Sequence, residues 1–418
     1  MSKLKKQIKK AFLKQEKKGN IIGKIYRAAV TKKRKNRHSK FAKLPIDENL
    51  FVFECFMGRQ YSDSPKAIYE YLIKENKNPD AHYVWCFRDS AMSESDHVID
   101  KEKTSIVRWG TKDYYKVYAT AKYWFTNARI PAEIDRREGQ IYTQCWHGTP
   151  LKKIGIDINS GLTESTETIR KVILQDAKRY SYMLSPSKYC SERFISAFGL
   201  KEIGKENIII EEGYPRNDSI ITKDEKDVQK IKEKLGIIGK KVILYAPTYR
   251  EDQRVNQDYI QKAILDFDNL REKIGEEYIV LFRAHYYIAN IFDFEKYQGF
   301  VMDVSKYPDI NDLYVASDIL ITDYSSVFFD FAILKRPIIF YMHDLNYYKD
   351  ELRGLYLPTE ELPGPIVKTQ DELIEKMKQI EIWSRSLDYK ECMDSFNLKF
   401  AYKEDGESTA RVVNKIVK

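Results

Sequence analysis

The chain has 418 residues, of which 43% are hydrophobic and 13% aromatic, and this length exceeds what a single hydrophobic core usually holds. Residues 1–43 carry 17 basic side chains and one acidic one, whereas the remainder carries 54 basic and 61 acidic ones. The net charge of +9 therefore comes from the N-terminal segment, and the acidic body argues against a nucleic-acid binder. Five cysteines without a CxxC pair argue against zinc and disulfide frameworks.

The N-terminal segment predicts a basic amphipathic helical arm. Leu4, Ile8 and Phe12 recur at helical spacing, and Ile21 and Ile25 repeat the pattern, with lysines between them. Helices of this kind lie in the interface of anionic membranes. No apolar run approaches the roughly 20 residues of a spanning helix. We therefore expect residues 1–43 to hold the protein peripherally on the cytoplasmic face of the cell membrane, with a solvated basic helix or disordered tail as the alternative.

Apolar runs typical of strands alternate with helical stretches along the rest of the chain. In the first part we expect strands at Asn49–Phe56, His82–Phe87, Tyr123–Thr126, Ile141–Trp146, Tyr182–Ser185 and Asn207–Glu211. In the second part we expect them at Lys241–Tyr245, Tyr278–Phe282, Phe300–Val304, Ile319–Thr322 and Pro337–Tyr341. This alternation predicts an α/β protein with two parallel sheets that face each other across a cleft.

The domain limits follow from this pattern. After the 1–43 arm, we place one Rossmann-like domain at 44–221 and a second at 222–395. A C-terminal helix within 396–418 is expected to cross back to the first domain.

Two of the six histidines end strand-like runs at matching places in the two halves. His147 lies in CWHGTPLKKIG, and His285 lies in LFRAHY. Ligands of open α/β sheets bind at strand ends, and imidazole is suited to moving a proton near neutral pH. An ordinary half-buried histidine is the alternative for each one. Because Lys152, Lys153 and Arg283 flank the pair, we favour the functional interpretation.

Two serines in the string DYSSVFFD predict a phosphate site. Ser325 and Ser326 follow an expected strand and open a helix, where their hydroxyls and the backbone N–H groups can bind an anion. We expect them to cap the helix as well as bind phosphate. Asp330 lies about one turn further on, and it either meets a sugar hydroxyl or phosphate-neighbouring group or is an ordinary surface carboxylate.

Further cations and hydroxyls follow other strand ends. Pro247 and Thr248 end one strand, Arg283 ends another, and Pro215 stiffens the backbone before Arg216, whose guanidinium suits bidentate phosphate contact. Together they predict a pyrophosphate site. The chain has neither a GxxxxGK[ST] loop nor a GxGxxG loop after a strand, which argues against nucleoside triphosphatases and nicotinamide enzymes. No metal site stands out, so we expect a transfer chemistry of histidine, lysine and arginine without an obligatory metal or cofactor, with a divalent ion that screens the phosphates as the alternative.

Several long strings identify a resemblance. The chain is similar to the CDP-glycerol glycerophosphotransferase family of wall teichoic acid synthesis from about Phe51 to the C-terminus. The strings include FMGRQYSDSPKAIYEYL, CWHGTPLKKIG, GYPRND, LYAPTYRED, DINDLYVASDILITDYSSVFFDF and DELRGLYLP. The resemblance implies two Rossmann-like domains of the glycosyltransferase-B type and a membrane-associated enzyme. It also implies that the domain at 44–221 is the acceptor-side domain and that the domain at 222–395 is the CDP-donor-binding domain.

The resemblance also implies the reaction and the roles of single residues. Glycerol phosphate would move from CDP-glycerol to a polyprenyl-diphosphate-linked saccharide acceptor, with release of CMP. His147 would be the general base, and His285 would stabilise the transferring phosphoryl group or its leaving group. Donor contacts would come from Gly148, Thr149, Pro150, Leu151, Arg216, Pro247, Thr248, Arg283, Ala284, Ser325, Ser326 and Asp330.

Alternatives remain at this stage. CDP-ribitol could replace CDP-glycerol, a sugar-nucleotide glycosyltransferase shares the fold type, and a membrane-tethered nucleotide-binding scaffold would bind donor without turnover. Longer polymerising members carry an extra N-terminal domain that this chain lacks, which favours a priming-type enzyme, although short chains can also polymerise. The sequence does not indicate the oligomeric state.

Overall fold

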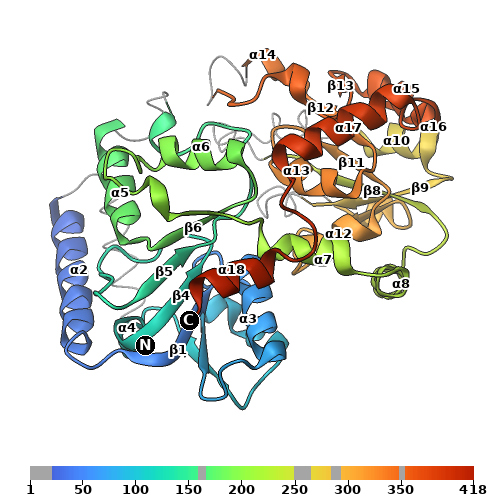
Figure 1. The fold of residues 1–418 in the computed structure, drawn as a ribbon. Helices are drawn as coiled ribbons and strands as arrows, with labels where there is room; N and C mark the ends of the chain where they lie inside the picture. Colours follow the sequence, from blue (N-terminus) through green and yellow to red (C-terminus); the bar gives the residue numbers. More distant parts are fainter. Residues whose placement is uncertain (1–20, 159–165, 249–264, 284–292, 348–353) are drawn as a thin grey trace. The chain divides into compact units, whose positions relative to one another are not determined.

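The computed structural model of the chain describes residues 21–158, 166–248, 265–283, 293–347 and 354–418 (Figure 1). The strands are β1 (Asp47–Glu54), β2 (His82–Phe87), β3 (Thr104–Arg108), β4 (Ala121–Thr126), β5 (Ile141–Gln144), β6 (Tyr182–Ser185), β7 (Ile209–Glu211), β8 (Lys241–Ala246), β9 (Tyr278–Phe282), β10 (Val301–Asp303), β11 (Ile319–Thr322), β12 (Ile338–Tyr341) and β13 (Ile366–Val367).

The α-helices of the described ranges are α2 (Ile21–Phe41), α3 (Asp63–Glu75), α4 (Lys112–Thr120), α5 (Thr166–Arg179), α6 (Lys188–Ala197), α7 (Asp218–Thr222), α8 (Glu225–Leu235), α10 (Phe267–Ile274), α12 (Ile310–Ala316), α13 (Val327–Phe331), α14 (Leu345–Tyr347), α15 (Gln370–Lys378), α16 (Ile380–Trp383), α17 (Leu387–Phe400) and α18 (Ser408–Ile416). The 3-10 helices are η1 (Asp89–His97), η2 (Gly155–Asp157), η3 (Glu206–Ile208), η4 (Pro215–Asn217), η6 (Glu295–Tyr297), η7 (Ala332–Leu334) and η9 (Thr359–Glu361).

The strands form two sheets, ordered β3-β2-β1-β4-β5-β6-β7 and β10-β9-β8-β11-β12-β13. Pairing is parallel from β3 through β4, between β6 and β7, and throughout the second sheet. The predicted strands are all present, with shifts at their ends. The expected α/β architecture with two Rossmann-like sheets is confirmed.

The apolar character of the strands explains why both faces of the second sheet are covered. All five residues of β9 are buried, as expected for a strand inside a parallel sheet with helices on both faces. Along β8, Val242 and Leu244 belong to one hydrophobic cluster, whereas Ile243 and Tyr245 belong to another. The period of two therefore directs alternate side chains into two separate cores.

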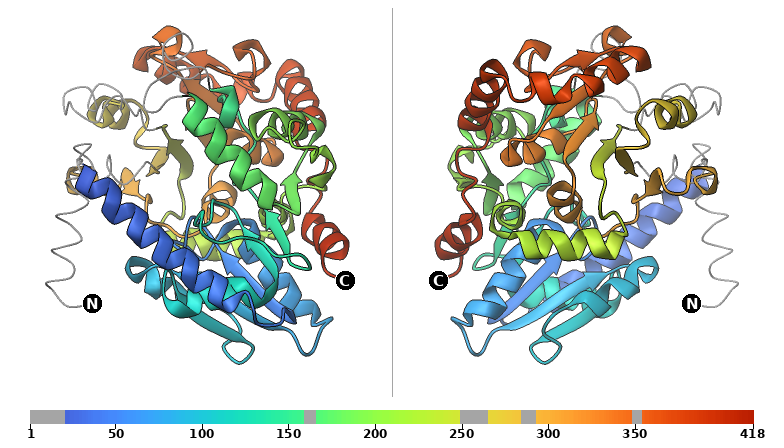
Figure 2. Two further views of the ribbon diagram at one scale, coloured as in Figure 1. Left: turned by 90° about the vertical axis from the view of Figure 1, so that its left-hand side faces the viewer. Right: turned by 90° about the vertical axis from the view of Figure 1, so that its right-hand side faces the viewer.

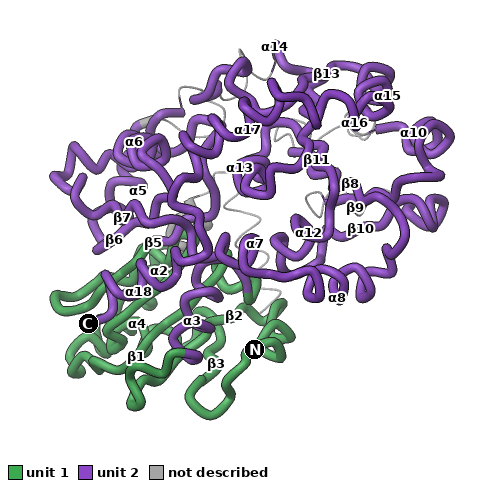
Figure 3. The backbone as a smooth tube through the Cα atoms, turned by 45° about the vertical axis from the view of Figure 1, so that its right-hand side comes forward, with its two compact units in different colours: residues 1–61, 75–143 green, residues 62–74, 144–418 purple. Residues whose placement is uncertain are grey.

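The chain divides into two compact units, residues 1–61 with 75–143 and residues 62–74 with 144–418 (Figure 3). The predicted domain limits differ from this division, and they stay a prediction. Within the second unit, α18 packs against η4, and Asp218, the first residue of α7, accepts hydrogen bonds from the backbone N–H groups of Ser408 and Thr409 at 2.9 and 2.7 Å.

In the first unit, the long helix α2 lies against α4, and the two views of Figure 2 show α2 as one unbroken helix. His38 is buried on the packed side, and Arg34 forms an ion pair with Glu133 at 3.5 Å. The remainder of the predicted arm, residues 1–20, lies outside the described residues. No helix in the described ranges combines the length and apolar character needed to span a bilayer.

Candidate functional site

The loop after β5 holds His147 away from the protein core, within the second unit. Trp146 has a φ of 53°, and its indole stacks on the His147 ring with centroids 4.4 Å apart. The same indole makes edge contacts with Phe194 and Phe198 of the α6 region. The His147 side chain is exposed. The aromatic anchor therefore fixes the turn and leaves the imidazole accessible to a substrate.

The residues that follow, 150–153, form hydrogen bonds with other segments of the second unit. The Tyr189 hydroxyl donates to the carbonyl oxygen of Pro150 at 3.0 Å, and Tyr356 donates its backbone N–H to the Leu151 carbonyl oxygen at 2.8 Å. Lys152 forms an antiparallel bridge with Leu355. Pro150 and Leu151, predicted as donor contacts, are buried and hold the loop, as does the buried Thr149.

Gly148 brings this loop against the DYSS segment. Its φ is 151°, and a Cβ built there would stand 2.8 Å from the Ser326 hydroxyl oxygen and 4.0 Å from a terminal nitrogen of Arg216. Any side chain at position 148 would therefore meet Ser326. Three segments that the sequence analysis singled out separately thus converge at this point of the second unit.

Ser325 and Ser326 are half-buried just before α13. The expectation that they cap the helix is wrong for Ser326, because it occupies the N-cap position without a capping hydrogen bond from its side chain. Its φ and ψ of −67° and −7° are helical, whereas a capping residue has extended backbone angles. The Ser326 hydroxyl instead faces Gly148.

Arg216 lies beneath this contact and is buried. Its Nη2 donates to both carboxylate oxygens of Asp330, at 3.1 and 2.9 Å, and its Nη1 lies 3.5 Å from Asp63. Burial alone would lower the pKa of the guanidinium, but the charges of Asp330 and Asp63 raise it above its ordinary value. Among the described residues, Nη1 has no hydrogen-bond partner.

Asp330 is therefore not a surface carboxylate, because it is buried and paired. Burial raises its pKa, while Arg216 and Asn217 oppose that rise. Asn217 donates to Asp330 at 3.1 Å and to Glu404 at 3.1 Å. Burial raises the pKa of Glu404 to about 8, so this carboxyl is largely protonated at neutral pH.

The ends of β8 and β11 form a second part of the site. Asp323 accepts the backbone N–H of Thr248 at 2.9 Å and that of Tyr324 at 2.6 Å, so one carboxylate links both strand ends. Pro247, which precedes Thr248, is half-buried.

Arg283 at the end of β9 binds backbone carbonyl groups through one terminal nitrogen, and its contact with the donor stays a prediction. Its Nη1 donates to the carbonyl oxygens of Val304 and Tyr307, at 3.0 and 2.8 Å, and burial lowers the pKa of its guanidinium. Nη1 therefore braces two carbonyl groups. The predicted residues Ala284 and His285 lie outside the described residues.

Sequence reasoning missed Asp63, Asn217, Asp323 and Glu404. Asp63 and Asp323 lie within the strings YSDS and DYSS, and Asn217 lies in GYPRND, so the motifs contained a signal for three of them. Asp63 also has a φ of 63°, which a non-glycine residue seldom adopts. Glu404 lies in no such string.

Comparison with known proteins shows the family of the chain. Residues 37–418 match the family described as CDP-Glycerol:Poly(glycerophosphate) glycerophosphotransferase. The chain is 40% identical to a teichoic acid poly(glycerol phosphate) polymerase of Bacillus subtilis, over 98% of this chain and 55% of that protein. It is also 40% identical to a teichoic acid glycerol-phosphate transferase of Staphylococcus aureus, over 90% of this chain and 95% of that protein.

A solved structure of the wall teichoic acid polymerase TagF is similar, with a TM-score of 0.81 and 35% identity over 94% of each chain. This likeness confirms the predicted glycosyltransferase-B type of fold. The chain spans about half the length of the Bacillus subtilis polymerase and nearly all of the Staphylococcus aureus transferase.

Proposed function

The chain belongs to the CDP-glycerol:poly(glycerophosphate) glycerophosphotransferase family, and from that premise we propose that it transfers glycerol phosphate from CDP-glycerol to a polyprenyl-diphosphate-linked teichoic acid acceptor. Relatives support the glycerol donor. Four that are named for glycerol-phosphate polymerisation or transfer are 37–40% identical, whereas a glycerol-phosphate primase is 31% identical and three relatives named for ribitol phosphate are 26–32% identical. A solved TagF structure soaked with CDPG supports the same donor.

In the proposed reaction, His147 removes the proton from an acceptor hydroxyl, whose oxygen attacks the phosphorus next to glycerol. A new P–O bond forms, the phosphoanhydride bond breaks, and CMP leaves with the bridging oxygen. Positively charged and hydroxyl groups must then stabilise the departing phosphate. Arg216 and Ser326 supply such groups, and His285 is assigned the same task by resemblance alone.

The single observation that carries this proposal is the contact of Gly148 with Ser326 above Arg216. It places the exposed His147 one residue from a hydroxyl and from the Arg216 guanidinium, whose nearest nitrogen, Nη2, donates to Asp330. The other terminal nitrogen, Nη1, has no hydrogen-bond partner among the described residues and lies 3.5 Å from Asp63. Because a buried charged donor without an acceptor is costly, we propose that a phosphate oxygen of the donor supplies that acceptor.

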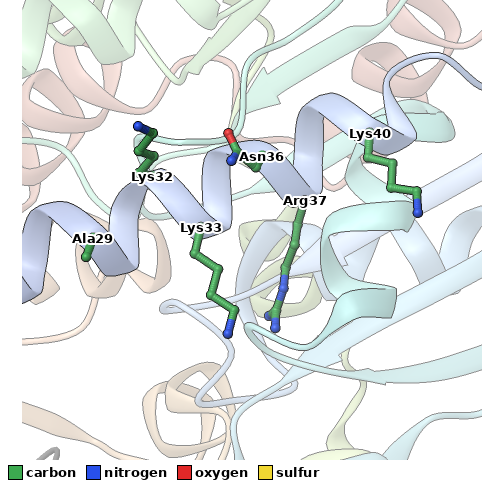
Figure 4. Close-up of a pocket in the computed structure, with 6 residues that line it drawn as sticks. All are labelled: Ala29, Lys32, Lys33, Asn36, Arg37 and Lys40. Carbon is green, nitrogen blue, oxygen red and sulfur yellow. The ribbon is translucent and has the colours of Figure 1, made fainter.

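We also propose that α2 contributes to membrane association. A shallow groove of about 490 Å³ runs along this helix (Figure 4). Its lining includes four cations, which we call the basic groove of α2: Lys32, Lys33, Arg37 and Lys40. The helix contains no acidic residue, so none of its side chains repels an anionic lipid surface.

The function is tested by CMP release from CDP-glycerol and, separately, from CDP-ribitol. Each donor is offered with and without a lipid-linked disaccharide that already carries one glycerol phosphate. The proposal predicts CMP release from CDP-glycerol that requires the acceptor. Release only from CDP-ribitol would mean that the enzyme transfers ribitol phosphate instead of glycerol phosphate. Donor binding without release would contradict the proposal. The length of the product separates a priming enzyme from a polymerase.

A further inference from the structure

The turn that follows β1 in the first unit is strained and firmly held. Phe56, Met57 and Gly58 have φ angles of 45°, 60° and 76°. For each non-glycine residue such a conformation costs roughly 1–2 kcal/mol. The side-chain oxygen of Asn127 accepts the Phe56 N–H at 2.7 Å, and the Gly58 carbonyl oxygen accepts the Arg88 N–H at 2.7 Å. The turn is therefore fixed to the ends of β2 and β4.

This turn holds two arginines side by side. The Nε of Arg88 donates to the Met57 carbonyl oxygen at 2.6 Å, and Arg59 donates from Nη1 to the Phe56 carbonyl oxygen at 3.1 Å. The two guanidinium groups thus bind successive carbonyl groups of one turn. Burial lowers the pKa of Arg88, and the nearby charge of Arg59 lowers it further, as expected for adjacent like charges. Trp109 lies under the Arg88 guanidinium, 4.4 Å from it.

The charge of this pair is poorly balanced by carboxylates. Across the described part of the chain, neither Arg59 nor Arg88 forms an ion pair within 4.0 Å, and the neighbouring Asp89 is engaged by Arg108 at 2.9 Å. Below them, Glu54 is fully buried and accepts the hydroxyls of Tyr114 and Tyr118. Burial raises the Glu54 pKa to about 7, so near neutral pH it supplies only part of a negative charge.

We propose that Arg59 and Arg88 bind a phosphate group of the acceptor, an assignment that rests on the proposed function. Two fork-shaped cations fixed at the carboxyl ends of parallel strands suit bidentate contact with phosphate oxygens. A rigid, strained turn explains why the like charges stay adjacent. The donor phosphates are assigned instead to the site around Arg216 in the second unit.

The test measures initial rates for Arg59→Gln, Arg88→Gln and the double variant, each checked for folding by circular dichroism. The acceptor concentration is varied at saturating CDP-glycerol, and the donor concentration is varied at saturating acceptor. We expect the KM of the acceptor to rise at least roughly tenfold in the double variant, as for loss of a charge-assisted contact, with the donor KM within twofold. Arg59→Lys should recover part of the loss, and Arg108→Gln is the matched control.

A second readout is independent of turnover. Glycerol 1-phosphate is titrated into the full chain by calorimetry, and its binding should weaken in Arg59→Gln but not in Arg108→Gln. An unchanged acceptor KM in the folded double variant, or a rise confined to the donor KM, would overturn the assignment. If the wild-type chain released no CMP, the proposed function would fail, whereas the titration would still report on the arginine pair.

Discussion

Trp146 and Gly148 adopt positive φ angles of 53° and 151° on either side of His147. At Trp146, a non-glycine residue, this conformation is strained, and such strain persists only where packing enforces it and concentrates at functional sites; at Gly148 it carries no such cost. Here the Trp146 ring packs on Phe194 and Phe198, while Gly148 lies against Ser326. The exposed imidazole is thus presented by a turn whose conformation the surrounding side chains determine.

Gly148→Ala tests the close packing of this turn against Ser326. A Cβ would stand 2.8 Å from the Ser326 hydroxyl oxygen, so the loop or the serine must move. We expect kcat/KM for CDP-glycerol to fall at least roughly tenfold, because small misplacements of reacting groups are costly. Gly204→Ala is the control, since it has a φ of 64° and open space around the new methyl group. A kcat/KM within twofold of wild type in Gly148→Ala would refute the argument.

A buried carboxyl group connects strand β1 with helix α4. Glu54, the last residue of β1, accepts hydrogen bonds from Tyr114 and Tyr118 of α4 at 2.9 and 3.0 Å. Burial is the largest cause of its raised pKa of about 7, and the tyrosine hydrogen bonds only partly oppose it. The folded state therefore binds a proton that the unfolded chain releases at lower pH.

Glu54→Gln should change how stability depends on pH. With a pKa of 4.5 unfolded and about 7 folded, Glu54 favours folding at low pH, and this contribution of about 3 kcal/mol is lost as pH rises from about 5 to 7. We expect the variant to lose this dependence, because the amide oxygen of the new side chain still accepts from the tyrosines but does not titrate. Urea unfolding at pH 5 and pH 8 measures it, with the exposed Glu102→Gln as control. Identical pH profiles for Glu54→Gln and wild type would contradict the prediction.

The elements also show what sequence reasoning could and could not find. Continuous apolar runs such as Tyr278–Phe282 were predicted as strands from their composition. All five residues of this run are buried, which explains why the run is apolar throughout. Strand β3 was missed, since only Thr104 of its five residues is buried and its pattern resembles a loop. The two-residue β13 is too short to produce a periodic signal.

In the candidate site, too, some features could be predicted from the sequence and others could not. His147 and Ser326 were found because strand ends and hydroxyls leave local signals. The pairing of Arg216 with Asp330 was not predicted, because Asp330 lies 114 residues further along the chain and only the fold brings the two side chains together. A sequence pattern shows a cation, but it does not show that a distant carboxylate already engages it.

For the whole molecule, the segregation of charge is the main feature. The excess of basic residues lies in the N-terminal segment, and its described part presents the basic groove of α2. The packed side of the same helix is engaged through Arg34 and the buried His38. The proposed membrane contact would therefore involve a helix that is also held against the body of the first unit.

Replacing the four cations of the basic groove of α2 by glutamine should weaken binding to anionic vesicles by at least roughly tenfold, since each cation near such a surface contributes about 1 kcal/mol. Co-sedimentation with phosphatidylglycerol vesicles at low and high salt measures this, and phosphatidylcholine vesicles test the role of charge. The control makes the same change of charge on α8: Lys226, Lys230, Lys232 and Lys234. Equal losses for both variants would show that net charge, rather than α2, controls binding.

His147, held in the loop that meets Ser326 and Arg216, is the residue that we propose as the base of a glycerol-phosphate transfer. The most direct measurement compares acceptor-dependent CMP release by wild type, His147→Ala and His97→Ala, where His97 is an exposed histidine of the first unit. We predict that His147→Ala lowers kcat by a factor of roughly 10²–10⁴ with CDP-glycerol binding retained, as expected for loss of a general base, and that His97→Ala matches wild type. A His147→Ala rate within threefold of wild type would contradict the account.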